Sequence, residues 1–583
     1  MEYRHLAEAY ARIESTSGLL EKTQILSSLL KGAPPKEVGR VVALTLGKLH
    51  PDWMGTPAIG VAEKTAVQVV AVAASVSETK VQAEVRKTGD IGAAAEALLA
   101  GTAQGALFVE EPTVSFVYET LDATAKTSGQ GSSREKTAKL TGLLSSLSPL
   151  EAKYVLRTVL GDLRLGLGDM IMIDALATAF VGDKTASEEI EHAFNVCSDL
   201  AHVADALAVR GMSTVRSIKA EVGTPIRMMA AKKLATPAEI MQKVGQRALA
   251  EFKYDGERIQ VHKDGDKITL FSRRQERITD QYPDVVDYVH QNVIAKRCII
   301  EGECVAVDSS TGKMRPFQEL MQRRRKTDID KMKELVPTGI YFFDILYLED
   351  RDVTALPMLE RRSLLEKAVK KSDRVNLTTG EVIDDSERLG AFFNRALESG
   401  AEGIIAKAVH KDSGYQAGSR SWLWIKLKAS YQEGISDTVD LVIVGALHGR
   451  GKRTGVYGAI LASVYDPDSD TYPTICKIGT GFTDEILSEM KQRLDKYKLE
   501  KRNPKVISDM KADVWFDPQV VIEVIGDQIT QSPVHTAGRG KLTGGGLAIR
   551  FPRFTGRWRE DKGPTQATTV DDIVDMFESQ RER

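Results

Sequence analysis

ALAEFKYDGER, residues 248–258, is the stretch of this 583-residue chain that decides its central fold. An apolar run of strand length leads into Lys253, and Gly256 and Arg258 follow it closely. A lysine is a nucleophile only when its ammonium is deprotonated, which burial and nearby cations promote. Gly256 lets the backbone turn tightly beside a reacting phosphate, and Arg258 offers a planar clamp for phosphate or carboxylate. The stretch therefore suits a covalent nucleotide site, although an exposed lysine before an Asp-Gly turn would give the same letters.

The composition is that of a globular protein with several domains. Hydrophobic residues make up 42% of the chain, charged residues 27%, and the net charge is −2, so a uniformly basic protein is excluded. A chain of this length predicts roughly three or four domains. No apolar run is long enough to span a bilayer, and the first residues do not begin a secretory signal. The four cysteines lack metal-ligand spacing, so we expect neither a zinc site nor a disulfide framework. We expect the protein to lie in the reducing cytoplasm.

Three kinds of sequence follow one another along the chain. Over residues 1–218, leucines at helical spacing and alanine-rich stretches predict an all-α domain. Over residues 219–434, strand-like runs alternate with helical stretches, which predicts an α+β domain rather than a doubly wound parallel sheet. Over residues 435–583, short strands with glycine-rich turns predict a small β-barrel followed by a C-terminal helix.

Five further segments place charged residues in apolar, strand-like surroundings. They are SRR (272–274), EGE (301–303), YFFD (341–344), EGIIAK (402–407) and WLWIKLK (422–428). A carboxylate inside an apolar strand needs a partner or a metal ion, and strand alternation puts Lys426 and Lys428 on one face. Taken alone, each segment is explained by core packing or by a solvated face as simply as by a functional site. Their occurrence within one part of the chain indicates a shared site.

The common nucleotide-binding loops are missing from the sequence. No G-x-x-x-x-G-K-[ST] run occurs, and no G-x-G-x-x-G opens a strand-to-helix turn. If the protein uses a nucleotide, covalent capture by a lysine is the natural alternative to a phosphate-binding loop.

The ordered set KYDGER, SRR, EGE, YFFD, EGIIAK and WIKLK, followed by RFPRF and REDK near the end, resembles ATP-dependent DNA ligases of the archaeal and replicative eukaryotic type. The resemblance covers nearly the whole chain. It implies an all-α DNA-binding domain (1–218), an α+β adenylation or nucleotidyltransferase domain (219–434), and an OB-fold β-barrel domain with a C-terminal helix (435–583). It further implies ATP and Mg²⁺ as cofactors. The protein would be a monomer that acts on nicked double-stranded DNA in replication, repair and recombination, and it would not bind a membrane.

The resemblance also implies a role for each matching residue. Lys253 would attack the α-phosphate of ATP, release pyrophosphate and hold AMP as a phosphoramidate, which then activates the 5′-phosphate of a nick. The nucleotide-binding residues would be Glu251 at the adenine edge, Phe343 stacked on the adenine, Arg258 and Arg273 on phosphate or the nick, Glu303 and Glu402 on the ribose or a metal ion, and Arg420, Lys426 and Lys428 on the triphosphate. In the last domain, the segment that orients the leaving pyrophosphate would contain Arg553, Arg559, Asp561 and Lys562.

Two segments keep two interpretations each. The glycine-rich run 161–168 resembles a family segment whose backbone amides approach DNA phosphates, but its glycines would equally permit close helix packing. The cationic run 323–326 would contact DNA or form a solvated loop.

Two further segments concern partners and motion. Gln104, Leu107 and Phe108 partly match the peptide by which such ligases hold a sliding clamp, or they end a packed helix. Residues 430–437 would form a hinge that lets the last domain serve different steps.

Other classes of function remain open. An RNA ligase or an mRNA-capping nucleotidyltransferase shares the lysine motif, but explains neither the helical domain nor the RFPRF ending. A non-catalytic nick-binding scaffold is opposed by the required residue type at every reactive position. An NAD-dependent ligase is disfavoured because its four-cysteine zinc site is missing.

Overall fold

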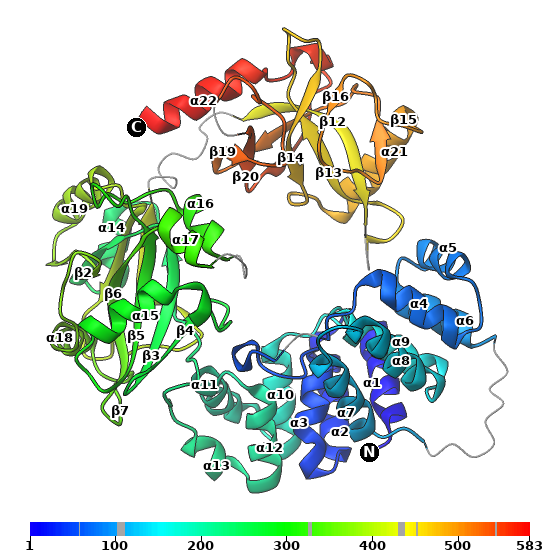
Figure 1. Cartoon of the computed structure of the whole chain (residues 1–583), viewed down its shortest axis with the longest axis horizontal. Coiled ribbons are helices and arrows are strands. Elements are labelled where there is room, and N and C mark those ends of the chain that lie inside the picture. The colour runs from blue at the N-terminus through cyan, green and yellow to red at the C-terminus, as the bar shows by residue number, and fades with distance from the viewer. Residues whose placement is uncertain are drawn as a thin grey trace. The chain divides into compact units, whose positions relative to one another are not determined.

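The structure is a computed structural model that describes residues 1–56, 59–101, 111–324, 329–428, 438–449, 453–542 and 545–582. The chain separates into two compact units, one of Met1–Val85 with Ile91–Lys428 and one of Arg86–Asp90 with Ala429–Arg583. The first unit contains a helical part and a part built on two sheets, and the second is built mainly on one large sheet (Figure 1).

The N-terminal part is helical, as the sequence predicts. Leu26, Val42, Leu156 and Ile173, from four of its helices, are fully buried in one shared core. The helices are α1 (Tyr3–Ser15), α2 (Leu19–Gly32), α3 (Val38–Thr45), α4 (Glu63–Ala73), α5 (Glu78–Thr88), α6 (Ile91–Leu99), α7 (Val114–Lys126), α8 (Ser132–Ser145), α9 (Pro149–Val159), α10 (Asp169–Phe180), α11 (Ser187–Cys197), α12 (Leu200–Arg210) and α13 (Met212–Ser217).

The glycine-rich run 161–168 is the loop that leads into α10. A Cβ added to Gly161 or Gly168 would meet no atom within 4 Å, so these two glycines are not required for close helix packing. Gly161 and Gly166 instead have φ of 72° and 61°, a left-handed conformation that glycine adopts without strain. The packing interpretation is therefore wrong for Gly161 and Gly168, and the approach of the loop amides to DNA stays a prediction.

The middle part holds two sheets, largely antiparallel, which confirms an α+β arrangement. The five-stranded sheet has the order β1 (Ala230–Lys233), β11 (Arg420–Lys428), β10 (Gly403–Ala408), β2 (Ala248–Lys253) and β9 (Gly380–Ile383). The six-stranded sheet has the order β4 (Lys267–Ser272), β3 (Glu257–Asp264), β5 (Arg297–Ala306), β6 (Thr338–Leu348) and β7 (Arg351–Asp352), with β8 (Val375–Leu377) beside β6. The helices are α14 (Pro237–Val244), α15 (Pro283–Asn292), α16 (Phe317–Leu320), α17 (Ile329–Leu335), α18 (Met358–Ala368) and α19 (Ser386–Glu398).

The step from one sheet to the other occurs directly after Lys253. β2 ends at Lys253, and β3 begins at Glu257 in the other sheet. Gly256 lies so close to β5 that a Cβ there would be 2.2 Å from the carbonyl oxygen of Cys304. Because no side chain fits at that distance, glycine is required where the chain crosses between the two sheets.

The second unit is built on a curled sheet and ends in a helix. β12 pairs with β13, and different parts of its other edge pair with β17 and with β18, with register shifts near Gly445 and His448. Its elements are β12 (Val439–His448), β13 (Tyr457–Ser463), β14 (Tyr472–Ile478), α21 (Asp484–Leu494), β15 (Lys498–Leu499), β16 (Val506–Ile507), β17 (Val514–Phe516), β18 (Val521–Ile525), β19 (Gln528–Ser532), β20 (Gly546–Arg550), β21 (Arg553–Trp558) and α22 (Val570–Glu582). The predicted short strands and C-terminal helix are confirmed.

The cationic run 323–326 has to be corrected at its first residue. Arg323 is 1% exposed and donates to the carboxylate of Asp284 and to the backbone carbonyls of Gln281 and Val336. A buried guanidinium with these acceptors stabilises the fold and is neither a solvated charge nor a DNA contact. Residues 325 and 326 lie outside the described residues.

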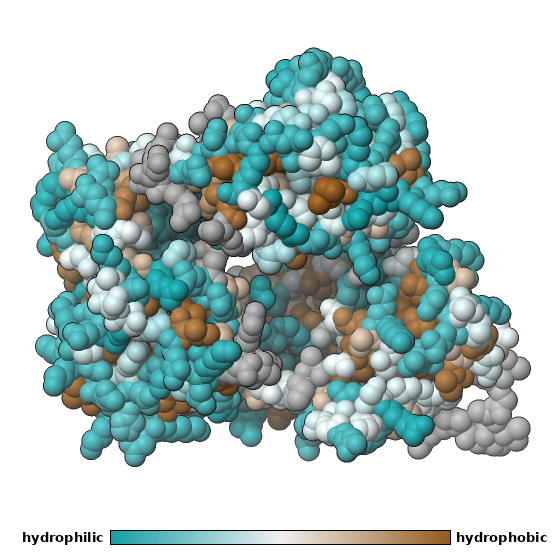
Figure 2. All heavy atoms as spheres, turned by 45° about the horizontal axis from the view of Figure 1, so that its top comes forward, coloured by the Kyte–Doolittle hydropathy of each residue, from teal (hydrophilic) through white to brown (hydrophobic). Residues whose placement is uncertain are grey.

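The surface and the cysteines are those of an ordinary globular fold. The face in Figure 2 is largely hydrophilic with separate hydrophobic spots. Within the described ranges, no helix combines the length and apolar character that a membrane crossing needs. Cys197, Cys298, Cys304 and Cys476 are all buried and form no disulfide.

Candidate active site

Neighbouring strands bring Lys253 to a carboxylate and a second lysine. The register of β10 places Gly403 opposite Lys253 of β2 on one side and opposite Lys428 of β11 on the other. Glu402, the residue before Gly403, forms ion pairs with both ammonium groups. Burial alone would raise the pKa of Glu402, but Lys253 and Lys428 hold it below its ordinary value. The predicted contact between the KYDGER, EGIIAK and WIKLK segments is thus present.

Two more carboxyl groups lie near Lys253. Burial, the largest cause, together with Asp255 and Glu402, raises the pKa of Glu303 to about 7, although Lys253 and Arg258 oppose the shift. Burial and the charge of Glu402 also raise the pKa of Asp255. Carboxyl groups that raise each other's pKa in this way form a site that a bound cation would stabilise.

Lys426 is the most strongly perturbed lysine of the site. Burial, followed by repulsion from Lys428, Lys253 and Arg420, lowers its pKa to about 8. Such crowding of cations is unfavourable by itself and becomes favourable when a polyanion binds. Lys426 and Lys428, which alternation along β11 assigns to one face, therefore lie in the same cationic environment as Lys253 and Arg420.

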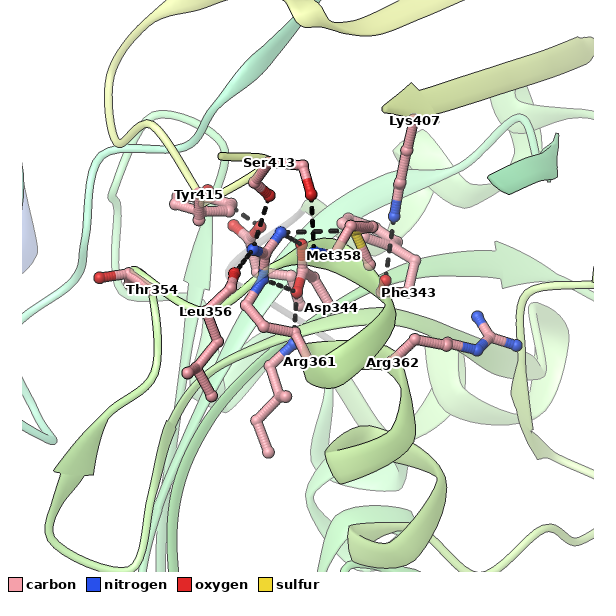
Figure 3. Close-up of polar contacts among 12 residues, drawn as sticks. Phe343, Asp344, Thr354, Leu356, Met358, Arg361, Arg362, Lys407, Ser413 and Tyr415 are labelled. Carbon is pink, nitrogen blue, oxygen red and sulfur yellow. Dashed lines mark hydrogen bonds and ion pairs between the residues drawn. The ribbon is translucent and has the colours of Figure 1, made fainter. Parts of the chain in front are cut away.

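Glu251 lies two residues before Lys253 and is only 2% exposed. Its Oε1 accepts from Arg362 Nη1 at 2.6 Å and from Thr378 Oγ1 at 2.7 Å, and its Oε2 pairs with Lys407 Nζ at 2.6 Å. Lys407 also donates to the backbone carbonyl of Phe343 at 3.0 Å, and Figure 3 shows its side chain directed at that carbonyl. The two residues assigned to the adenine are thus joined through one buried lysine.

A fully buried ion pair involves Asp344, the residue that follows Phe343. Asp344, the next residue on β6, accepts from Arg361 Nε at 2.8 Å and from Nη2 at 3.0 Å, and both side chains have no exposed surface. Arg361 also donates to the backbone carbonyls of Leu356 and Ser413 (Figure 3). Because its charge and donors are satisfied, this pair fixes α18 against β6.

Arg258 is not the free clamp that the sequence suggests. Its guanidinium donates to the carbonyl of Met229 and to Glu301 at 2.7 Å each, and lies 5.1 Å from the ring centre of Phe343. Burial opposes its charge, but Glu301 and Tyr415 raise the pKa of Arg258 above its ordinary value. Nε of Arg258 is buried without a hydrogen-bond partner, while the other donors fix the guanidinium beside the Phe343 ring.

Of two further predicted residues, Arg420 lies beside the lysine site and Arg273 does not. Arg420 is exposed at the start of β11 and adds to the positive charge around Lys426. Arg273 is exposed at the end of β4 and lines a separate cavity with Arg274 and Arg227. No contact of the described residues connects Arg273 with Lys253.

The four predicted residues of the second unit differ in their surroundings. Arg559 Nη1 lies 2.8 Å from both oxygens of Asp440, and its Nε and Nη2 bind Asp561. Lys562 reaches the same Asp440 at 2.6 Å, while Arg553 is exposed on β21. Asp440 therefore holds Arg559 and Lys562 together.

The sequence analysis missed four residues of these clusters. Lys407 belongs to the EGIIAK segment but carries no predicted role, and Arg362 belongs to a stretch predicted only as a helix. Thr378 and Asp440 contact their partners over 127 and 119 residues of sequence. A buried-looking lysine in an apolar strand was the one available signal, because an unpaired buried charge is costly.

The fold and the lysine-centred site together define a nucleotidyltransferase. Three family models match: "DNA ligase N terminus" at residues 2–177, "ATP dependent DNA ligase domain" at 228–428 and "ATP dependent DNA ligase C terminal region" at 453–562. The chain is 49% identical to DNA ligase 2 of Thermofilum pendens, covering 100% of this chain and 98% of that one. It is 45% identical to a DNA ligase of Staphylothermus marinus, covering 100% and 99%.

The chain belongs to the family of archaeal-type ATP-dependent DNA ligases. Among solved structures, "Pmar-Lig_Pre." has a TM-score of 0.56 at 16% identity and covers 95% of this chain and 99% of that one, which shows a shared fold.

Proposed function

We propose that this chain seals nicks in duplex DNA with ATP, through AMP bound to Lys253 and then to the 5′-end of the nick. The observation that carries the proposal is the position of Lys253, which ends a strand beside Glu402 and in the same electrostatic environment as Lys426 and Lys428. Lysine attack on a phosphate needs the negative charge of the phosphate to be neutralised, and Lys426 and Lys428 supply positive charge for this.

The chemistry divides one displacement into three. First, the neutral amine of Lys253 bonds to the α-phosphorus of ATP while the bond to pyrophosphate breaks, and Nζ loses one proton. Second, an oxygen of the 5′-phosphate at the nick bonds to that phosphorus while the bond to Lys253 breaks, and Nζ regains a proton. Third, the 3′-hydroxyl loses its proton, attacks the 5′-phosphate and displaces AMP. Splitting one difficult transfer into easier ones is the purpose of covalent catalysis.

The contacts around Lys253 support the roles that the family resemblance implies for the individual residues. Phe343 and Glu251 would hold the adenine, since the ring and the carboxylate are fixed to each other through Lys407. Lys426, Lys428 and Arg420 would neutralise the triphosphate. Arg258 would contact the bound nucleotide through its Nε, and the exposed Arg273, in its separate cavity, would contact the nick.

The carboxyl groups fit a magnesium ion shared with the substrate. In the described part of the chain no three acidic, histidine or cysteine side chains form a metal cluster on their own. Mg²⁺ is commonly held by one or two carboxylates together with substrate phosphates, and Glu303 and Glu402 provide such a pair. When bound, Mg²⁺ would offset the charge that develops on the phosphates.

The domain organisation belongs to the same proposal. Residues 1–218 would grip the DNA backbone, 219–434 would carry out adenylation, and the curled sheet of 435–583 would be an OB-fold. The enzyme would be a cytoplasmic monomer that acts on nicked double-stranded DNA. Its clamp segment, through Gln104, Leu107 and Phe108, and its hinge at 430–437 lie outside the described residues and stay predictions.

Mass spectrometry of the full chain incubated with ATP and Mg²⁺ tests the proposal. We expect one added AMP on Lys253, and we expect Lys253→Ala to lose the adduct and at least about 10⁴-fold in sealing rate, because the nucleophile is gone. Lys411→Ala, at an exposed position of the same domain, is the matched control and should behave as the wild type.

Three results would contradict the proposal. Sealing by Lys253→Ala at the wild-type rate would remove the covalent step. Labelling by GTP in place of ATP would favour a capping-type enzyme, and sealing of RNA but not DNA would favour an RNA ligase.

A further inference from the structure

The surroundings of the Glu251 carboxylate leave room for one more hydrogen bond. An ionised carboxylate accepts about four hydrogen bonds, two at each oxygen. Oε1 already has two donors, Arg362 Nη1 and Thr378 Oγ1, and Oε2 has one, Lys407 Nζ. Among the described residues no donor occupies the second position of Oε2. A ligand that reaches this carboxylate must therefore bring a donor to Oε2.

Several hydrogen bonds hold Arg362 in place, and Arg362 in turn fixes the orientation of the Glu251 carboxylate and of its remaining acceptor position on Oε2. Its Nη1 donates to Thr378 Oγ1 at 3.0 Å as well as to Glu251, its Nη2 donates to the Thr378 carbonyl at 2.9 Å, and its Nε binds Glu366 at 3.0 Å. The Thr378 hydroxyl accepts from Arg362 and so has its single proton directed at Glu251. Both donors on Oε1 thus depend on one guanidinium, whose side chain is 13% exposed.

We propose that Arg362, acting through Thr378 and Glu251, is the positioning residue that selects adenine among the purine nucleotides. The proposal rests on the proposed function, in which Glu251 meets the base. The amino group at C6 of adenine is a donor and fits Oε2, whereas guanine has an acceptor oxygen there and would be repelled. Lys407 fixes the position of the Glu251 carboxylate relative to Phe343, because it binds both Oε2 and the backbone carbonyl of Phe343.

The test compares ATP with purine riboside triphosphate, which has hydrogen in place of the amino group, in the adenylation of Lys253. We expect the wild type to prefer ATP by about 10- to 100-fold in kcat/KM, the value of one hydrogen bond to a charged acceptor. In Arg362→Met the preference should fall to about threefold or less, mainly through the KM for ATP, because Oε1 loses its guanidinium donor and the carboxylate can then rotate about its remaining contact with Lys407.

The ratio of the two nucleotides separates positioning from folding, since a general loss of structure lowers both rates alike. Thr378→Val removes the hydroxyl at nearly constant volume and should lower the ratio in the same direction. Arg388→Met is the matched control, because Arg388 is an exposed arginine of the same domain with two carboxylate partners. Its ratio should equal that of the wild type.

An unchanged ratio in both Arg362→Met and Thr378→Val, with Lys253 still labelled, would overturn the inference and leave the proposed function intact. A fall of equal size in Arg388→Met would overturn it as well. A wild-type protein that takes no AMP on Lys253 would instead contradict the proposed function itself.

Discussion

Lys426 shows how a single side chain responds to its neighbours in the active site. Its pKa is lowered to about 8 by burial, then by Lys428, Lys253 and Arg420, while Glu402 opposes the shift. Below that pH the ammonium is charged, and the charge is lost as the pH rises through 8. If Lys426 binds the triphosphate, its contribution to kcat/KM for adenylation should disappear over the same interval, since this parameter follows the free enzyme.

Substitution of Lys426 by arginine makes this pH dependence measurable. A guanidinium stays charged at every accessible pH, so Lys426→Arg should lack the loss of kcat/KM above pH 8. We expect the ratio of wild type to variant to fall by about 3- to 10-fold between pH 7 and pH 9.5. The measurement is the rate of Lys253 labelling by limiting ATP across that range. Parallel pH profiles would show that another group causes the loss.

At the same scale, the sequence predicts the residues of the site better than their contacts. The motif order correctly indicates that Lys253, Glu402 and Lys428 meet, because the strands that carry them have recognisable alternation. It does not reveal that Arg258 already donates to a carbonyl and a carboxylate from other parts of the chain. The sequence does not distinguish a guanidinium with internal partners from one without them, and only the fold does.

At the scale of elements, the contact between β6 and α18 depends on the buried pair of Asp344 and Arg361. Asp344→Asn would leave the guanidinium buried without a counter-charge, which costs about 3–5 kcal/mol of unfolding free energy. We therefore expect a clear fall in thermal stability by scanning calorimetry of the full chain. Asp287→Asn, which removes an exposed partner of Lys333, should change the stability by no more than about 0.5 kcal/mol.

Equal shifts in Asp344→Asn and Asp287→Asn would contradict this account of the pair. The double substitution of Asp344→Leu with Arg361→Met should recover much of the lost stability, because replacing both charges removes the unpaired one.

Elements were predictable where one local pattern determines them. The strand that ends at Lys253 and the C-terminal helix both have such patterns. The pairing of β12 with two different strands, β17 and β18, along one edge has no local sequence pattern, because it follows from the curl of the sheet. Arg323 was misjudged for a related reason: its partner Asp284 lies 39 residues earlier in the chain.

At the scale of the whole molecule, the second unit carries Arg559 and Lys562, which the family resemblance assigns to the leaving pyrophosphate. Arg559 is 12% exposed and already binds Asp440 and Asp561, so its role within the unit is to hold Asp561 and β12 in place. Lys562 is 34% exposed, and its contact with Asp440 uses one of its three donors. We therefore expect Lys562, rather than Arg559, to donate to a phosphate.

Lys562→Ala should therefore slow one step and spare another. If Lys562 orients the leaving pyrophosphate, labelling of Lys253 by ATP should fall by about 10- to 100-fold, because a charged donor to the developing anion is lost. Sealing of a nick that already carries AMP at its 5′-end releases no pyrophosphate and should stay within about threefold of the wild type. Lys541→Ala is the matched control, since Lys541 is 35% exposed in the same unit and pairs with Asp468 and Asp571. A loss of similar size in both steps would mean that Lys562 acts through the stability of its unit, and an unchanged labelling rate would assign the pyrophosphate to other residues.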